Sequence, residues 1–146
     1  MKLKYYKLDD VAFEPTYGTA ESAGFDLYAI NGVEIAPKKS VIIHTGIAME
    51  IPKGYFGAIY PRSGLAIKLG LRLQNCVGVI DSDYRGEIMI GLYNDSDEYR
   101  DISFGDRVAQ MIIQPYVHAE LDQHDVSELN INTERSTGGF GSTGRN

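Results

Sequence analysis

Short runs of apolar and β-branched residues recur between turn signals along most of this 146-residue chain. The runs cover residues 33–36, 41–51, 55–60, 77–80, 87–93 and 108–117, and the turns between them are rich in Gly, Pro, Asn and Asp. Many short strands at this spacing are typical of sandwiches, jelly rolls and related barrels. The pattern therefore predicts a single all-β domain, because neither an internal repeat nor a linker divides it.

Residues 64–69 are predicted to form a short helix, with Ser63 as its N-cap and Gly70 as its stop. Arg62 and Ser63 precede the N-terminus of this helix, where free N–H groups and the helix dipole favour anions. Residues 61–64 are therefore a candidate phosphate site, although an ordinary capped turn explains them equally well.

The net charge of −6 and a pI of about 5.0 argue against binding to a nucleic-acid backbone, which needs clustered Lys and Arg. A single nucleotide needs only a few local cations, and four arginines lie in or beside glycine-containing motifs: Arg62, Arg85, Arg107 and Arg135. No apolar run approaches the roughly 20 residues that span a bilayer, and the N-terminus is too polar for a signal peptide. Cys76, the single cysteine, stands in an apolar context, which predicts a buried thiol in a reducing cytoplasm.

The apolar run 77–80 leads directly into a polar turn that begins at Asp81. A carboxylate at the end of a strand is held more firmly than one on a loop, which suits a general base that orients water. Asp83 is typical of a turn, and Tyr84 suits either a pocket wall or a packed aromatic. Residues 71–77 are a predicted hairpin arm whose main-chain amides could read the edge of a base.

Residues 135–144 hold four glycines, four hydroxyl side chains, one arginine and one aromatic residue, Phe140. Such a segment cannot bury a core of its own, and glycine loses more backbone freedom on ordering than any other residue. Main-chain N–H groups, hydroxyls and arginine can hold phosphate, while an aromatic ring can stack on a base. Composition alone favours a disordered tail, whereas the rest of the chain favours a lid over a nucleotide.

Two further segments combine charge with apolar runs. Asp26 lies within the small and apolar run 23–29, and Asp106 and Arg107 precede the run 108–117. Neighbouring acidic and basic side chains often form structural ion pairs, and we expect one between Asp106 and Arg107. The histidines are expected to be structural or solvent-facing; they are His44, His118 and His124.

Together, five segments closely resemble the motifs of the trimeric dUTP diphosphatase (dUTPase) family, in the family order. They are AGFDLYA at 23–29, PRSGLA at 61–66, GVIDSDYRGE at 78–87, GDRVAQMII at 105–113 and RSTGGFGSTG at 135–144. The resemblance covers the chain from end to end, and five motifs in order are far more specific than any one of them. Ser136 is a departure, because many members carry glycine there; it adds a hydroxyl and stiffens the start of the tail.

The resemblance implies a distorted β-jelly roll (residues 1–134) with a glycine-rich lid (135–146), assembled as a homotrimer whose sites are shared between subunits. It implies that Asp81 activates water, that Tyr84 packs under the deoxyribose, and that Asp26 meets Mg²⁺ through water. The implied substrate-binding residues, which read uracil, contact phosphates or close the lid, are Arg62, Ser63, Gly64, Asn75, Gly78, Val79, Ile80, Tyr84, Gln110, Arg135, Phe140, Gly141, Ser142 and Thr143.

The implied reaction is attack of water on the α-phosphorus of dUTP, giving dUMP and pyrophosphate. It limits uracil incorporation into DNA and supplies dUMP for dTMP synthesis. A positioned general base contributes about 10²–10⁴-fold, and Mg²⁺ and arginines would add electrostatic stabilisation. Mg²⁺ fits because it prefers oxygen ligands, and the sequence has no His/Cys cluster for zinc.

Two alternatives stay open. A dCTP deaminase can share this fold, but it needs a glutamate positioned at the base and usually has a longer chain. A binding or regulatory protein could use the same scaffold to dock to a partner. A P-loop NTPase is excluded, because the tail lacks the lysine-containing signature and no strand–helix unit follows it.

Overall fold

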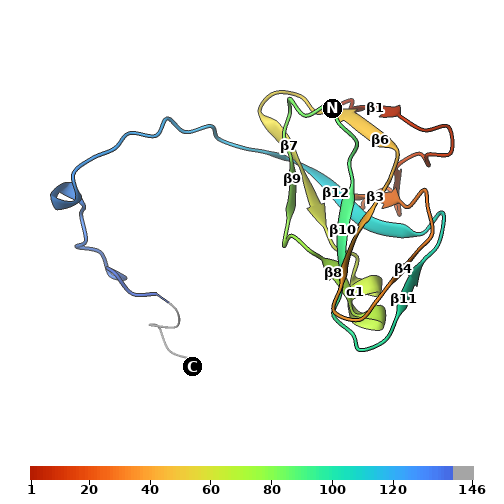
Figure 1. The fold of residues 1–146 in the computed structure, drawn as a ribbon. Helices are drawn as coiled ribbons and strands as arrows, with labels where there is room; N and C mark the ends of the chain where they lie inside the picture. Colours follow the sequence, from red (N-terminus) through yellow and green to blue (C-terminus); the bar gives the residue numbers. More distant parts are fainter. Residues whose placement is uncertain (140–146) are drawn as a thin grey trace.

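Pairing between short strands builds most of the regular structure in the computed structural model, which describes residues 1–139. The largest sheet is antiparallel and has the order β2-β3-β12-β7-β9 (Figure 1). Its strands are β2 (Thr16–Tyr17), β3 (Phe25–Tyr28), β12 (Arg107–Pro115), β7 (Tyr55–Tyr60) and β9 (Gly78–Ile80). The long strand β12 lies at its centre, between β3 and β7, and β9 forms one edge.

Three smaller antiparallel sheets complete the fold. They pair β5 (Ser40–Ile43) and β8 (Leu71–Leu73) with β10 (Ile90–Asn94), β1 (Lys4–Lys7) with β6 (Ile47–Glu50), and β4 (Val33–Ile35) with β11 (Arg100–Ile102). The all-β prediction is confirmed. The periodicity did not predict four of the strands: β1 and β2 are exposed, β11 buries only Ile102, and the buried strand β3 carries Asp26 within its apolar residues.

Strand β10 shows how the sheets enclose the core. Ile90, Leu92 and Asn94 are buried, and the residues between them are only partly so, which is the period of two expected for a strand with one inner face. Asn94 is fully buried, and its amide donates to the main-chain oxygens of Ile35 and Glu98. A buried amide with both donors satisfied links three segments at little desolvation cost.

The predicted run 41–51 is two strands rather than one. Gly46 separates β5 from β6 and adopts a φ of +64°, a left-handed conformation that disfavours residues with a side chain. A Cβ atom there would also lie 2.9 Å from the Cβ atom of Ala12. The apolar sequence conceals this turn, because residues on both sides of it enter the core.

Helix α1 (Ser63–Leu69) lies where the sequence predicts it and ends at Gly70, which has the expected left-handed conformation. The predicted N-cap is wrong: Ser63 is the first helical residue, and Arg62 occupies the cap position without a capping side-chain hydrogen bond. The prediction for Cys76 is also wrong, because its thiol is exposed in the turn between β8 and β9. Among residues 1–139, no helix has the length and apolarity required to cross a membrane.

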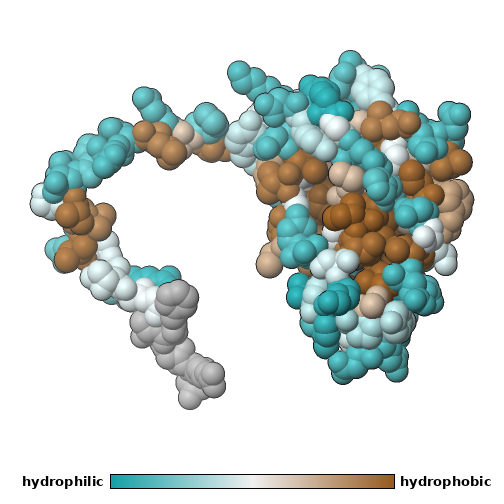
Figure 2. Space-filling model, viewed as in Figure 1, coloured by the Kyte–Doolittle hydropathy of each residue, from teal (hydrophilic) through white to brown (hydrophobic). Residues whose placement is uncertain are grey.

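After β12 the chain leaves the body as an arm, residues 116–139, which is extended apart from a short 3-10 helix at Val126–Glu128 (Figure 1). Apolar side chains along the arm are almost fully exposed: Val117 is 92%, Leu121 95% and Val126 82% accessible. Figure 2 shows hydrophobic surface both on this arm and on the body. The division at residue 135 stays a prediction.

The turn between β5 and β6 is tied to the segment before β10 by Glu87. One carboxylate oxygen of Glu87 accepts hydrogen bonds from the main-chain N–H groups of Thr45 (3.1 Å) and Gly46 (2.8 Å), and the other lies 2.9 Å from Nδ1 of His44. Burial raises the pKa of Glu87, but the bonds to His44, Gly46 and Thr45 outweigh it, so the pKa lies below its ordinary value. The folded state thus favours the ionised carboxylate.

We predict that Glu87→Gln lowers the thermal unfolding temperature at pH 7, and that this difference disappears in acid. Because the pKa is depressed on folding, the stabilisation is complete above the ordinary value of 4.5 and is lost as the pH falls through the lower folded-state value. Calorimetric scans of both proteins from pH 7 to pH 3 would measure this difference in unfolding temperature. Glu34→Gln, at the exposed position of β4, is the control, and a difference that grows in acid would contradict the prediction.

Candidate functional site

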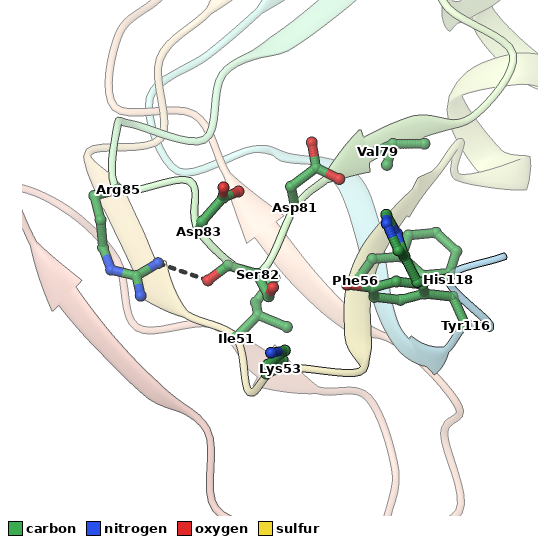
Figure 3. A pocket seen from close by; sticks show the side chains of 10 residues that line it. All are labelled: Ile51, Lys53, Phe56, Val79, Asp81, Ser82, Asp83, Arg85, Tyr116 and His118. Carbon is green, nitrogen blue, oxygen red and sulfur yellow. Dashed lines mark hydrogen bonds between the residues drawn. The ribbon is translucent and has the colours of Figure 1, made fainter. Parts of the chain in front are cut away.

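Asp81 follows edge strand β9 directly, as the sequence predicts. Strand β9 is held by β7, with Ile80 opposite Gly57, and the Asp81 main-chain oxygen accepts a 3.2 Å bond from Tyr84 N. Its exposed side chain lines an open cavity of about 840 Å³. Phe56, Tyr116 and His118 also line this cavity (Figure 3). Within residues 1–139, no hydrogen bond occupies the Asp81 carboxylate, so it is free to accept one from water.

The loop after Asp81 is held by its own contacts. Arg85 Nη1 donates to the main-chain oxygens of Ser82 (2.8 Å) and Tyr84 (2.9 Å), and Figure 3 shows the first of these bonds. The hydroxyl of Tyr84 donates to the main-chain oxygen of Glu87 at 2.9 Å. These contacts give a defined shape to the polar turn that carries Asp81 and Tyr84.

A second cavity, of about 340 Å³, collects charged and amide groups from motifs far apart in the sequence. Its lining includes Asp26, Arg62, Ser63, Gly64, Arg107 and Gln110. The pairing explains this convergence, because Gln110 on β12 lies opposite both Asp26 on β3 and Tyr60 on β7. Gln110 Nε2 also donates to the main-chain oxygen of Pro61 at 3.0 Å, which holds the chain just before Arg62.

The Asp26 carboxylate lies between two guanidinium groups. Its side chain is nearly buried, with Arg62 Nε 2.9 Å from one oxygen and Arg107 Nη1 3.3 Å from the other. Two cations against one carboxylate leave an excess of positive charge at the cavity. The arrangement therefore favours an anion with several oxygens, which arginine can bind bidentately.

The expected ion pair between Asp106 and Arg107 is wrong. Asp106 instead accepts a hydrogen bond from Ser103 N at 2.8 Å, and Arg107 pairs with Asp26. Sequence reasoning thus missed Arg107 as a site residue. A β-bulge explains the omission: β12 shifts register against β3 between Arg107 and Ala109, so simple alternation does not show which face Arg107 takes.

A third, smaller cavity of about 70 Å³ lies along β9 and includes four predicted site residues in its lining: Asn75, Gly78, Val79 and Ile80. Among the described strands, β9 pairs with β7 on one side and with none on the other. Main-chain groups on such an edge can bond to a ligand as they would to another strand. The predicted hairpin arm, residues 71–77, forms β8 and the turn after it, and leads into this open edge next to the turn that begins at Asp81.

Within one chain, the cavity at Asp81 and the cavity at Arg62 lie far apart. Continuing the register of β9 places Asp81 opposite Phe56, and the extended chain from Phe56 to Arg62 spans about 20 Å at 3.3 Å per residue. Asp81 and the second cavity, called the arginine cavity because Arg62 and Arg107 line it, therefore lie toward opposite ends of β7.

The arm holds one more of the predicted residues, Arg135. Arg135 lines none of these three cavities; its Nε donates to the main-chain oxygen of Gly138 at 3.0 Å, and Ser136 N bonds to Thr133 O at 3.1 Å. Ser136 has a φ of +47°, which is unusual for a residue with a side chain. Phe140, Gly141, Ser142 and Thr143 lie outside the described residues.

Comparisons with known proteins agree with the motifs. The dUTPase family model matches residues 12–144. The deoxyuridine 5'-triphosphate nucleotidohydrolase of Nautilia profundicola is 51% identical over 99% of this chain and 100% of its own. The protein of the same name from Candida albicans is 42% identical over 99% and 89%.

Solved structures agree as well. A mutant dUTPase of Staphylococcus bacteriophage 80alpha, solved with dUpNHpp, superimposes with a TM-score of 0.88 at 29% identity and covers 98% of both chains. A mutant dUTPase of phage phi11 of S. aureus, which coordinates a structural Mg(II) ion, gives 0.80 at 26% identity over 86% of this chain and 97% of its own. With matches of this extent in sequence and in fold, the chain belongs to the dUTPase family.

Proposed function

We propose that this protein hydrolyses dUTP to dUMP and pyrophosphate, with Asp81 as the general base. The observation that carries the proposal is the Asp81 carboxylate, held at the end of a paired strand and unoccupied by any described residue, beside a turn that fixes Tyr84. Such a group can orient a water molecule and take its proton as the water attacks the α-phosphorus. Membership of the family and relatives named for this activity support the same reaction.

Recognition of the nucleoside falls to the hairpin and to Tyr84. The open edge of β9 and the Asn75 amide would bond to the edge of uracil, and the Tyr84 ring would lie against the deoxyribose. A site that hydrogen-bonds one base edge penalises any base that leaves its buried groups unpaired. A ring packed against C2′ leaves no room for the hydroxyl of a ribonucleotide.

The phosphates would be held by Arg62, Ser63, Gly64, Arg107 and Gln110. Asp26 keeps the two guanidinium groups in place before substrate arrives, because it already pairs with both. Preorganised cations stabilise the charge that develops on the leaving pyrophosphate without having to move. Arg135, Phe140, Gly141, Ser142 and Thr143 would close over the substrate as a lid.

Mg²⁺ suits this donor set through water rather than by direct ligation. Asp26 is one carboxylate with both oxygens engaged by arginine, and residues 1–139 hold no group of three or more side chains that could bind a metal ion together. Mg²⁺ commonly keeps several waters and binds mainly to substrate phosphates. Bound in that way, it would neutralise charge on the phosphates.

The distance between the two halves of the site supports sites shared between copies, which agrees with the homotrimer that the family resemblance implies. Since Asp81 and Arg62 lie toward opposite ends of β7, a triphosphate reaches both only if they belong to different copies. The arm supplies a means of association, because Val117, Leu121 and Val126 are left exposed by the part of their own chain that the structure describes. We infer that another copy covers them. The cytoplasmic location stays a prediction, as do limiting uracil in DNA and supplying dUMP.

Release of pyrophosphate from dUTP, UTP, dTTP and dCTP, each with Mg²⁺ or with a chelator, tests the proposal directly. We expect release from dUTP with Mg²⁺ and far less from the other nucleotides or with the chelator. Ammonia produced from dCTP would instead favour the deaminase. No release from dUTP under any condition would overturn the proposed reaction.

We predict that Asp81→Asn lowers kcat by about 10²–10⁴-fold, because the amide cannot take the proton from water. The KM for dUTP and the unfolding temperature should change little, since asparagine fills the same space. Asp83→Asn, in the same turn, is the matched control and should keep most of the activity. Near-normal turnover by Asp81→Asn would remove this residue from the role of base.

We predict that deletion of residues 135–146 leaves a folded trimer with little activity. The described part of this segment, residues 135–139, adds nothing to the buried core, so light scattering should still give the mass of a trimer and circular dichroism an unchanged β signal. Hydrolysis of dUTP should fall, because water enters and the grip on the phosphates is incomplete. A truncated protein that works at the full rate would contradict the lid.

A further inference from the structure

The loop that carries Asp81 and Tyr84 rejoins the body of the protein at Glu87. Ile88 N donates to Ile47 O at 2.8 Å, and Thr45 Oγ1 donates to Ile88 O at 2.6 Å. The Glu87 carboxylate extends this attachment one residue toward Tyr84, through its bonds to the N–H groups of Thr45 and Gly46. The β5–β6 turn is thus the support for the far end of the loop.

Tyr84 depends on this end of the loop for its position. Its side chain is substantially exposed, so few neighbours restrain the ring, but its hydroxyl donates to the Glu87 main-chain oxygen at 2.9 Å. The ring also lies against Gly86, where a Cβ atom would be only 2.7 Å from Tyr84 Cζ. Gly86 therefore lies against the hydroxyl end of the ring, and the Glu87 main-chain oxygen accepts the hydroxyl's hydrogen bond.

The contacts of Arg85 do not replace this support. Arg85 Nη1 bonds to the main-chain oxygens of Ser82 and Tyr84, both within the same loop. These bonds fix the shape of the loop without attaching it to the β5–β6 turn. The Glu87 carboxylate attaches this loop to the β5–β6 turn.

We propose that Glu87 is a positioning residue for the choice of sugar: its carboxylate fixes the main-chain carbonyl that holds the Tyr84 hydroxyl, and so fixes the ring against the deoxyribose. This proposal rests on the proposed hydrolysis of dUTP. A wall that rejects one added hydroxyl works only if it cannot yield, because a shift of a few tenths of an ångström admits the larger sugar. Glu87 restrains the ring of Tyr84, which is otherwise exposed.

Steady-state kinetics with dUTP and UTP test the proposal in the unmodified protein, Glu87→Ala and Glu87→Gln. We expect Glu87→Ala to lower the ratio of kcat/KM for dUTP over UTP by about tenfold, with most of the change in KM. In Glu87→Gln the amide oxygen can still accept from Thr45 and Gly46 N–H, so selectivity should return to within about twofold of the unmodified protein. Rescue of this kind separates positioning from a general loss of stability.

Glu98→Ala is the matched control, because it also removes a carboxylate with a cation at 2.9 Å, Arg100, but in the turn between β10 and β11. It should leave the selectivity unchanged. Unaltered selectivity in Glu87→Ala, beside a clear preference for dUTP in the unmodified protein, would overturn this inference alone. Absence of dUTP hydrolysis in the unmodified protein would overturn the proposed function and the inference with it.

Tyr84→Phe keeps the test decisive if Glu87→Ala does not fold. It removes only the hydroxyl that reaches Glu87, from an exposed side chain, and should also admit more UTP. If Glu87 acts through this hydroxyl, the double variant Glu87→Ala with Tyr84→Phe should be no less selective than either single variant. Full selectivity in Tyr84→Phe, or additive effects of the two substitutions on selectivity, would contradict the proposal that Glu87 acts through the Tyr84 hydroxyl.

Discussion

Main-chain hydrogen bonding of β7 to β12 on one side and to β9 on the other sets the positions of Arg62 and Asp81. The register with β12 sets Gln110 opposite Tyr60 and so presents Arg62 to Asp26 and Arg107. The register with β9 ends at Gly57 and Ile80, which releases the chain into the turn at Asp81. Since one strand serves both, a slip of a single residue would disturb the cavity lined by Arg62 and Arg107 and the turn at Asp81 together.

Electrostatics inside the arginine cavity favour a bound anion. Asp26 satisfies both guanidinium groups in the absence of substrate, so neither arginine is left as an unpaired charge in a half-buried place. The same carboxylate limits how far the positive potential extends into solvent. That local balance is compatible with a net charge of −6 for the chain as a whole, because the excess of positive charge beside Asp26 is local.

Periodicity and turn chemistry were enough to predict the β architecture, the short helix and the position of Asp81 at the end of a strand. The errors have local causes. Gly46 interrupts an apolar run without any change in composition, and Arg62 rather than Ser63 takes the cap of α1. Cys76 is exposed because its neighbours form a turn. Such features depend on backbone dihedral angles, which a hydrophobic pattern does not encode.

The arginine cavity was harder to predict for the same kind of reason. The motif residues Asp26, Arg62 and Gln110 were named from the resemblance, but Arg107 was assigned to its sequence neighbour Asp106. A bulge in β12 sets its true partner, and bulges leave no clear mark in a sequence. The anchoring of the loop by Glu87 was equally hidden, since its partners at residues 44–46 lie some forty positions away.

Ser136 makes one bend of the glycine-rich arm less stable than a glycine at the same position would. At a φ of +47° its Cβ atom crowds the following carbonyl, which costs about 1 kcal/mol relative to glycine. Before any ligand arrives, the bend at this position is therefore about fivefold less populated than a glycine would make it. A single methylene carbon thus shifts the conformational equilibrium of the arm away from this bend, relative to the same arm with glycine.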